Sequence, residues 1–352
     1  MERRNFIKKV CKGSLLISIP ISFCSFKIKK TKTNIGIIAD VHQDIIHDGI
    51  SRLGVFINEM KKKKPNFIIQ LGDFSLPRQQ NQPFLDKWNS FDGEKYHVLG
   101  NHDFNDFGYT KKETMKWWDI DKSYYSYNCN DFKFIVLDGN DKNPEPWSGY
   151  HRYIGDKQKL WLNNELNKTL KPTIIFSHQS LEAKGGISNR KEIRKIIESH
   201  LISGNKSKVI ACISGHHHTD YVKKINKIPY IQINSMSYKW VGEKYKFRRF
   251  SSKIENQFPN ISKTCPYKDP LFTLITLDTL KETLNIKSRQ TSFIPPSPIE
   301  LKIPGAENMK ARISAIDLKL SAFNITSCPS SVIMLIKLRI KIPPIDFFLE
   351  KW

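Results

Sequence analysis

The fold is decided by residues 33–42, TNIGIIADVH, where an apolar run rich in β-branched residues gives way to polar residues. Such a run is typical of a buried strand, and the polar residues behind it are typical of a functional loop. Four further apolar runs, at residues 67–71, 96–99, 173–176 and 209–213, are likewise followed by polar residues. The sequence therefore predicts five buried strands, each ending in a residue type that can bind a metal ion.

Amphipathic helices are expected between these strands, because residues 50–63, 156–167 and 189–200 each place apolar side chains along one helical face. Residues 124–137 are typical of a β-hairpin. Further strands of a second sheet are predicted at residues 230–233, 271–277 and 283–286. Strands that alternate with helices indicate an α/β fold, here with two sheets flanked by helices.

The 352 residues can form one large catalytic domain with appendages. We expect the domain at residues 33–290 and a C-terminal extension of uncertain structure at residues 291–352. Within the domain, residues 239–268 are polar, aromatic and basic with little periodicity, which predicts a long surface excursion.

The N-terminal residues 1–32 are typical of an export signal. Arg3 and Arg4 precede Phe6-Ile7-Lys8, an apolar run and then a basic patch. This order resembles a twin-arginine signal, which serves proteins that fold before they cross the bacterial inner membrane. The apolar run is too short for a membrane span and contains Pro20, so we expect no stable span in the mature chain. The protein is predicted to be periplasmic or in the cell envelope, with lipidation at Cys24 as an alternative.

The formal charge of +23 is compatible with attraction to nucleic acid, an anionic membrane or a phosphorylated small molecule. The lysines are scattered through every segment, as biased codon usage would scatter them. The charge therefore does not choose among these partners.

Five motifs stand at the predicted strand ends. In chain order they are Asp40-x-His42, Gly72-Asp73, Gly100-Asn101-His102-Asp103, His178 and Gly215-His216-x-His218. Each alone arises often by chance, but together and in this order they resemble the calcineurin-like metallophosphoesterase superfamily. The resemblance covers residues 34 to about 236. It implies a four-layer α-β-β-α sandwich with two mixed β-sheets and a metal site on loops at strand ends.

The resemblance also implies roles for the motif residues. The first metal ion would be held by Asp40, His42 and His218. The second would be held by Asn101, His178 and His216, and Asp73 would bridge both ions. His102 would contact the phosphate and act as general acid, with Asp103 supporting it from behind.

Three further positions follow from their place beside these motifs. Residues two apart in extended backbone share a face, so His217 is expected to point away from the ions. Asn105 and Arg190 follow ligand motifs, where the walls of a binding site are expected, and are candidates for substrate binding.

The donor set points to particular metals, because imidazole with carboxylate and amide oxygen suits Mn, Fe or Zn. Two such ions about 3.5–4 Å apart can ionise a bridging water near neutral pH. Purple acid phosphatases carry a metal-binding tyrosine soon after the bridging aspartate, whereas here the first tyrosine after Asp73 is Tyr96. A colourless Mn or mixed-metal centre is therefore favoured.

These observations predict an exported, metal-dependent phosphoesterase that hydrolyses phosphate mono- or diesters of small molecules. The nucleophile would be a hydroxide held between two divalent ions. A nuclease is an alternative, since it would use the same metals and the basic charge. A non-catalytic, metal-poor binding domain is a second alternative.

Overall fold

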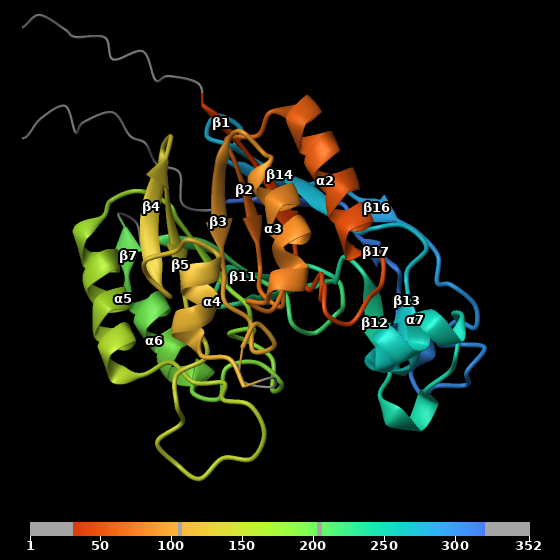
Figure 1. Cartoon of the computed structure of the whole chain (residues 1–352). Helices are drawn as coiled ribbons and strands as arrows, with labels where there is room; N and C mark the ends of the chain where they lie inside the picture. The colour runs from red at the N-terminus through yellow and green to blue at the C-terminus, as the bar shows by residue number, and fades with distance from the viewer. Residues whose placement is uncertain (1–30, 105–107, 203–205, 321–352) are drawn as a thin grey trace, which may run out of the picture. The chain divides into compact units, whose positions relative to one another are not determined.

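The computed structural model describes residues 31–104, 108–202 and 206–320, and the predicted export segment at residues 1–32 lies almost wholly outside them. Two six-stranded sheets dominate the described part of the chain (Figure 1). The first sheet has the order β18 (Ile316–Lys319), β15 (Thr283–Ile286), β14 (Thr273–Asp278), β1 (Lys32–Ile38), β2 (Phe67–Gln70), β3 (Glu94–His97). The second has the order β10 (Tyr221–Ile225), β11 (Ile228–Gln232), β9 (Val209–Ser214), β6 (Thr173–Ser177), β5 (Phe132–Val136), β4 (Tyr125–Cys129).

Each sheet combines parallel and antiparallel strands: β14, β15 and β18 form the antiparallel side of the first sheet, and β10 and β4 are the antiparallel edges of the second. In the first sheet β1, β2 and β3 are parallel. In the second sheet β5, β6, β9 and β11 are parallel. The carboxyl ends of parallel strands lie at one edge of a sheet, so the loops that carry the predicted motifs meet there.

Three apolar clusters define four layers. The central cluster joins the facing sides of both sheets, with Ile35 and Phe67 from one and Phe134 and Phe176 from the other. A second cluster packs the first sheet against α2 (Gly49–Lys63) and α3 (Gln82–Asn89). A third packs the second sheet against α5 (Asp156–Lys168) and α6 (Arg190–Ser199), as Figure 1 shows. The predicted four-layer fold with two mixed sheets is confirmed.

The outer helices form for reasons that the sequence carries. Leu53, Phe56, Ile57 and Met60 recur at helical spacing and are buried, which fixes the inner face of α2. Thr110 is the N-cap of α4 (Lys111–Trp117). Its side chain accepts the N–H of Glu113, and the Glu113 carboxylate accepts the N–H of Thr110. Among the described residues, no helix combines the length and apolar composition needed to cross a bilayer.

Two expectations about strands need correction or extension. Residues 271–277 and 283–286 do form strands, β14 and β15, but they pair beside β1 in the first sheet and not in the second. The alternating pattern predicts a strand but says nothing of its partner, which for β14 lies about 240 residues away in sequence. Residues 312–319, in the expected C-terminal extension, supply β17 (Arg312–Ile313) and β18, and residues 321–352 lie outside the described part.

The expected surface excursion has short elements of its own. β12 (Tyr238–Trp240) pairs with β13 (Thr264–Pro266), and between them lie the 3-10 turns η2 (Glu243–Tyr245) and η3 (Pro259–Lys263) and the helix α7 (Ser252–Gln257). The remaining short elements are η1 (Gln79–Asn81), β7 (Leu201–Ile202), β8 (Lys206–Ser207), β16 (Arg289–Gln290) and η4 (Ala306–Asn308).

Candidate metal centre

The first ligand group brings together Asp40 and His42, from the loop after β1, with His218, from the loop after β9. The Nε2 atoms of His42 and His218 lie 3.2 Å apart. His218 Nε2 lies 3.4 Å from Asp40 Oδ1. All three side chains are buried, and one atom from each lies within 4.8 Å of the others, which is a spacing that a single ion can bridge.

The second ligand group brings together Asp73, His178 and His216, which follow β2, β6 and β9. His178 Nε2 lies 3.2 Å from both Asp73 Oδ2 and His216 Nδ1. The amide oxygen of Asn101 lies 3.2 Å from the same His178 nitrogen. Asn101, the remaining predicted ligand, therefore faces this group with an oxygen.

Asp73 belongs to the second group but also faces the first. Its Oδ2 is 3.2 Å from His178 Nε2 and 3.5 Å from His42 Nε2. Its Oδ1 accepts the backbone N–H of His102 at 2.8 Å. One carboxylate oxygen thus faces a histidine of each group, the position that a bridging ligand needs.

The outer nitrogens of three histidines are held by neighbouring groups. His178 Nδ1 lies 2.8 Å from the carbonyl oxygen of Leu71, and His218 Nδ1 lies 2.9 Å from that of Tyr238. Since a carbonyl only accepts, both Nδ1 atoms carry a hydrogen and both Nε2 atoms face the site. His216 Nε2 lies 3.1 Å from the Tyr150 hydroxyl, so Nδ1 faces the site. Such outer contacts are the usual support of metal-binding imidazoles.

The backbone is strained at these ligands. Left-handed φ angles occur at Asp40 (50°), His42 (52°), Asp73 (52°), His216 (75°) and His218 (46°). Non-glycine residues rarely adopt this conformation, and such strain gathers at functional sites. Gly215 permits the close approach of two loops, because a Cβ there would stand 2.5 Å from Asp40 Oδ2. The chain therefore tolerates unfavourable backbone geometry in order to turn its ligands inward.

Burial and nearby carboxylates set the pKa values of His42, His178 and His216. Burial lowers the pKa of His42 to about 3 and the pKa of His216 well below its usual value. Burial acts on His178 in the same direction, but the charge and hydrogen bond of Asp73, the Asp40 charge and the Leu71 carbonyl together outweigh it and raise the pKa of His178 to about 9. His42 and His216 are thus neutral near pH 7, ready to bind an ion, whereas His178 must first lose a proton.

Asp103 makes contacts that the sequence did not predict. Its support of His102 stays a prediction, and in the structure its buried carboxylate accepts backbone N–H groups from the two ligand loops after β2 and β3. These come from Gly100 (2.7 Å), Asp73 (3.0 Å), Phe74 (2.6 Å) and Ser75 (3.2 Å). Burial, then the Asp73 charge, raise the pKa of Asp103 to about 8 against these N–H contacts. Adjacency in sequence suggested a partner for His102 but gave no sign of these backbone contacts.

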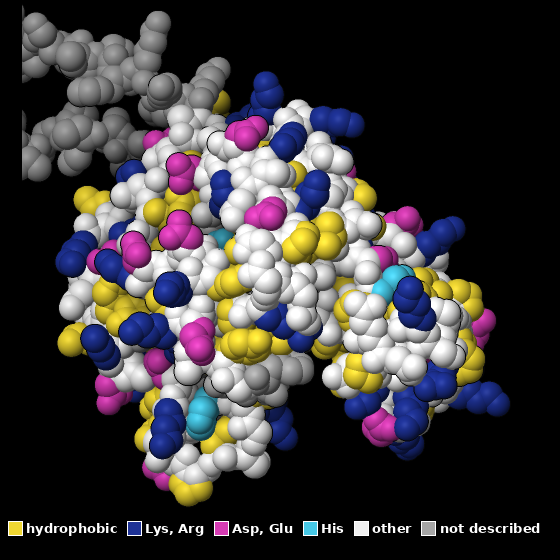
Figure 2. Space-filling view, viewed as in Figure 1, with side chains coloured by type: hydrophobic (Ala, Val, Ile, Leu, Met, Phe, Trp, Pro, Cys, Tyr) yellow, Lys and Arg dark blue, Asp and Glu magenta, His cyan; other side chains and the backbone are white. Residues whose placement is uncertain are grey.

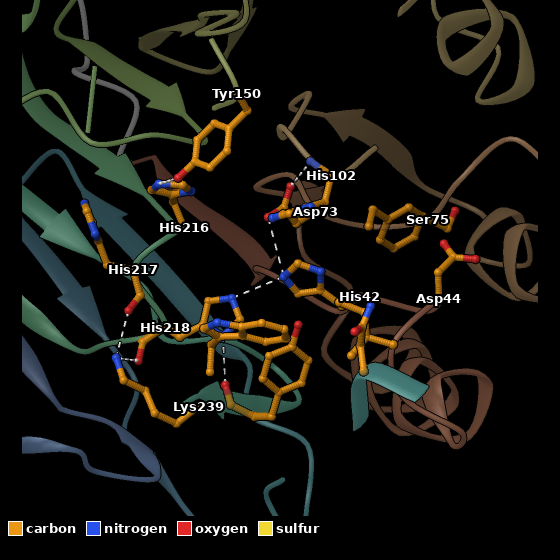
Figure 3. Close-up of a pocket in the computed structure, with 15 residues that line it drawn as sticks. His42, Asp44, Asp73, Ser75, His102, Tyr150, His216, His217, His218 and Lys239 are labelled. Atoms are coloured by element: carbon orange, nitrogen blue, oxygen red, sulfur yellow. Dashed lines mark hydrogen bonds and ion pairs between the residues drawn. The ribbon is translucent and has the colours of Figure 1, made fainter. Parts of the chain in front are cut away.

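A cavity of about 630 Å³ opens over both groups (Figure 3). Its walls include His102, Tyr150, His217 and Lys239, which come from four different loops or strands. His217 belongs to neither ligand group of the described residues, and its Nε2 lies 2.9 Å from the Ser180 hydroxyl. The Lys239 ammonium donates to the carbonyl oxygens of His217 and His218, both at 3.0 Å.

Of the two predicted substrate contacts, only Arg190 lies among the described residues, and it is not at the cavity. The Arg190 guanidinium lies 3.4 Å from the carbonyl oxygen of Ile187, and Arg190 is not among the described residues that line the cavity. Asn105 lies outside the described residues. Sequence reasoning missed Tyr150, Tyr238 and Lys239, because no motif marks them.

The donor set fits two divalent ions. Imidazole nitrogens, two buried carboxylates and one amide oxygen converge, and the outer contacts already orient the rings. The fold and this donor set together define a candidate two-metal centre on a four-layer α/β sandwich. The family model of calcineurin-like phosphoesterases matches residues 33–220, and the chain belongs to that family.

Known proteins resemble this chain to different extents. A manganese-dependent ADP-ribose/CDP-alcohol diphosphatase of Oryza sativa subsp. japonica is 30% identical over 149 residues, which cover 36% of this chain and 46% of that protein. The match thus spans about half the length of the curated relative.

Two solved structures share the fold at low identity. A dimetal phosphatase from Danio rerio is 14% identical with a TM-score of 0.52, covering 74% of this chain and 98% of that one. GAP50, the anchor in the inner membrane complex of Plasmodium, is 15% identical with a TM-score of 0.50, covering 82% and 89%. Because one of the two is described as an anchor, the fold alone does not decide activity.

Proposed function

We propose that this protein hydrolyses phosphate mono- or diesters, or the related diphosphate linkage, of small phosphorylated molecules with two divalent ions in the two ligand groups. The observation that carries the proposal is Asp73. Its single oxygen Oδ2 faces a histidine of each group at the floor of an open cavity. A lone structural metal would need neither the second group nor the opening.

The ions would bind the phosphate oxygens, offset their charge and activate water. The chain's own residues set the geometry for this. Asp73 holds the backbone N–H of His102, and this fixes the place of that histidine on the cavity wall. The His102 ring lies with its centroid 5.5 Å from that of His42, so it stands beside the ligands. From there it supplies a proton to the leaving oxygen.

Manganese is the proposed metal, with Fe or Zn as alternatives. The two carboxylates and the Asn101 oxygen add hard donors to the four imidazoles, which favours Mn over a softer ion. The relative's name, which includes manganese dependence and a diphosphate bond, supports both the metal and the inclusion of diphosphates.

Export to the periplasm or cell envelope is part of the proposal. It rests on the twin-arginine-like residues Arg3 and Arg4 and the short apolar run behind them. Detection of the tagged full chain in periplasmic rather than cytoplasmic fractions, and its loss with Arg3→Lys and Arg4→Lys together, tests this part.

A nuclease is less well supported. On the face in Figure 2, Lys and Arg side chains are spread over many elements with Asp and Glu among them. Among the described residues that line the cavity, Lys239 is the only Lys or Arg, and two carbonyl oxygens already hold its ammonium. A groove that follows a nucleic-acid backbone needs a row of such cations.

The test is hydrolysis by the full chain, supplied with Mn, of an aryl phosphate monoester, a diester and a dinucleotide diphosphate, with bound metal counted in parallel. Asp73→Asn should lower both metal content and turnover by at least about 100-fold, because loss of supporting contacts alone costs 10–100-fold. Asp44→Asn is the matched control. Asp44 also lines the cavity, but its carboxylate accepts from Leu76 N–H and Asn81.

Metal-dependent hydrolysis that survives in the control and is lost in Asp73→Asn supports the proposal. A full chain that binds no metal would contradict it and revive the binding-domain alternative. The ratio of the three rates then identifies the bond that is cleaved.

A further inference from the structure

The cavity has an aromatic outer wall that the metal chemistry does not use. Trp240, at the end of β12, lines the cavity although its side chain is 43% exposed. The ring of Tyr238 lies 5.2 Å from that of His42 and 6.4 Å from that of Trp240, centroid to centroid. Tyr238 thus lies between Trp240 and the ligand His42, and Trp240 is on the side that faces solvent.

A polar group lies on the same wall. Asn260, in η3, also lines the cavity, and its amide offers both donors and an acceptor. The two residues belong to one connected unit. Val241 and Gly242 each donate to the carbonyl oxygen of Lys263 at 3.0 Å, and Trp240 pairs with Thr264 across β12 and β13. The indole and the amide are thus held on a common support.

Resting on the proposed function, we propose that Trp240 and Asn260 form a subsite for a planar heteroaromatic ring, specifically a nucleobase, joined to the phosphate held at the ligand groups. An exposed indole face stacks on any base, and an amide can hydrogen-bond the edge of one. The favoured substrate class is therefore a nucleotide or a nucleoside diphosphate derivative.

The position of Trp240 distinguishes this subsite from a surface for protein docking. Phe247, in the same excursion, is similarly exposed at 44% but is not among the described residues that line the cavity. An occupant of the Trp240 wall shares one cavity with the phosphate site, whereas a docked protein would use the outer surface. Phe247 is thus the matched control.

Binding separates the ring from the phosphate. The full chain, loaded with Mn, is titrated calorimetrically with adenosine 5′-(α,β-methylene)diphosphate, whose P–C–P bridge resists hydrolysis, and with methylenediphosphonate, which lacks the nucleoside. Trp240→Ala should lower the affinity for the adenosine compound about tenfold or more and leave the affinity for methylenediphosphonate unchanged. Trp240→Phe should restore most of the loss, and Phe247→Ala should change neither affinity.

The subsite and the proposed function fail in different ways. Equal binding of the two compounds by the unmodified chain, or equal weakening of both in Trp240→Ala, overturns the subsite while metal-dependent phosphate binding stands. Failure of the unmodified chain to bind either metal or methylenediphosphonate overturns the proposed function itself, and the nucleobase proposal with it. Weakening confined to the adenosine compound supports the subsite.

Discussion

At the scale of single residues, the candidate centre depends on which nitrogen of each histidine faces inward. The backbone carbonyls of Leu71 and Tyr238 hold Nδ1 of His178 and His218, so each ring presents Nε2. A histidine motif alone cannot show this, because the accepting carbonyls come from distant segments. The rings are oriented before any ion arrives, which lowers the cost of binding one.

The protonation of His178 predicts how metal binding depends on pH. Its pKa is raised to about 9 in the metal-free chain, so the ring is charged below that pH and an ion must displace its proton. Affinity of the second group should therefore fall by up to about tenfold for each pH unit below 9. Calorimetry of Mn binding at pH 7 in buffers of different ionisation enthalpy should register release of about one proton from this ring. His178→Gln should abolish that proton release. If the unmodified chain releases no proton when it binds Mn, the raised pKa of His178 is contradicted.

Tyr150 is predicted to tune His216. Its hydroxyl lies 3.1 Å from His216 Nε2, the nitrogen opposite the one that faces the site. Tyr150→Phe should lower the affinity for one of the two Mn ions by 10–100-fold and leave the affinity for the other unchanged, because only the second group contains His216. Stepwise titration with a competing chelator measures both affinities. Tyr153→Phe, in the same loop but with its ring beside Lys159, is the control. Equal weakening of both ions would show a general loss of structure instead.

At the scale of elements, Asp103 joins the loop after β2 to the loop after β3. Four backbone N–H groups donate to its buried carboxylate, and these loops also carry Asp73 and Asn101. Asp103→Ala leaves those donors buried without acceptors, at about 1–3 kcal/mol each before relaxation. The metal-free protein should lose at least about 3 kcal/mol of unfolding free energy, measured by urea denaturation.

The control for Asp103 is an aspartate whose contacts are open to water. Asp156 has a side chain that is 92% exposed and pairs with Lys159, so Asp156→Asn should change stability by less than about 1 kcal/mol. If Asp103→Ala were as mild as this control, the carboxylate would not be what holds the two loops together.

The elements were predictable to the extent that their signals are local. Apolar runs with polar ends predicted β1, β2, β6 and β9, which are largely buried, and the candidate ligands that follow them. The run at residues 96–99 overlaps only the end of β3, which is an edge strand and partly exposed, so its predicted burial is wrong for the strand itself. Pairing is not local: Asn34 of β1 lies opposite Thr276 of β14, and nothing near either residue indicates the other. Tyr150 escaped notice for the same reason, because its partner His216 lies 66 residues away on another loop.

At the scale of the whole molecule, the formal charge of +23 acts on any anionic substrate before it reaches the cavity. The same charge would serve a nuclease, and the sequence alone leaves both open. The two substrates differ in how salt affects them. A small phosphate ester is attracted by the general field, which is screened within about 30 Å at 0.01 M salt and about 8 Å at 0.15 M. A polynucleotide instead releases counterions along its whole contact, so its affinity falls as a steep power of the salt concentration.

We therefore expect kcat/KM for a small phosphate monoester to fall severalfold as salt rises from about 0.01 M to 0.15 M, while kcat is unchanged. Salt screens the attraction between the protein and the approaching substrate but does not reach the buried ligand groups. The value of kcat/KM should therefore change with salt while kcat does not. A matched diester, with one charge fewer, should show a smaller decline, and this serves as the internal control. If single-stranded DNA were hydrolysed faster than either ester, with a log–log salt slope of several, the nuclease alternative would replace the small-molecule proposal. A decline that is equal for both esters would mean that general attraction by the molecular charge does not govern substrate capture.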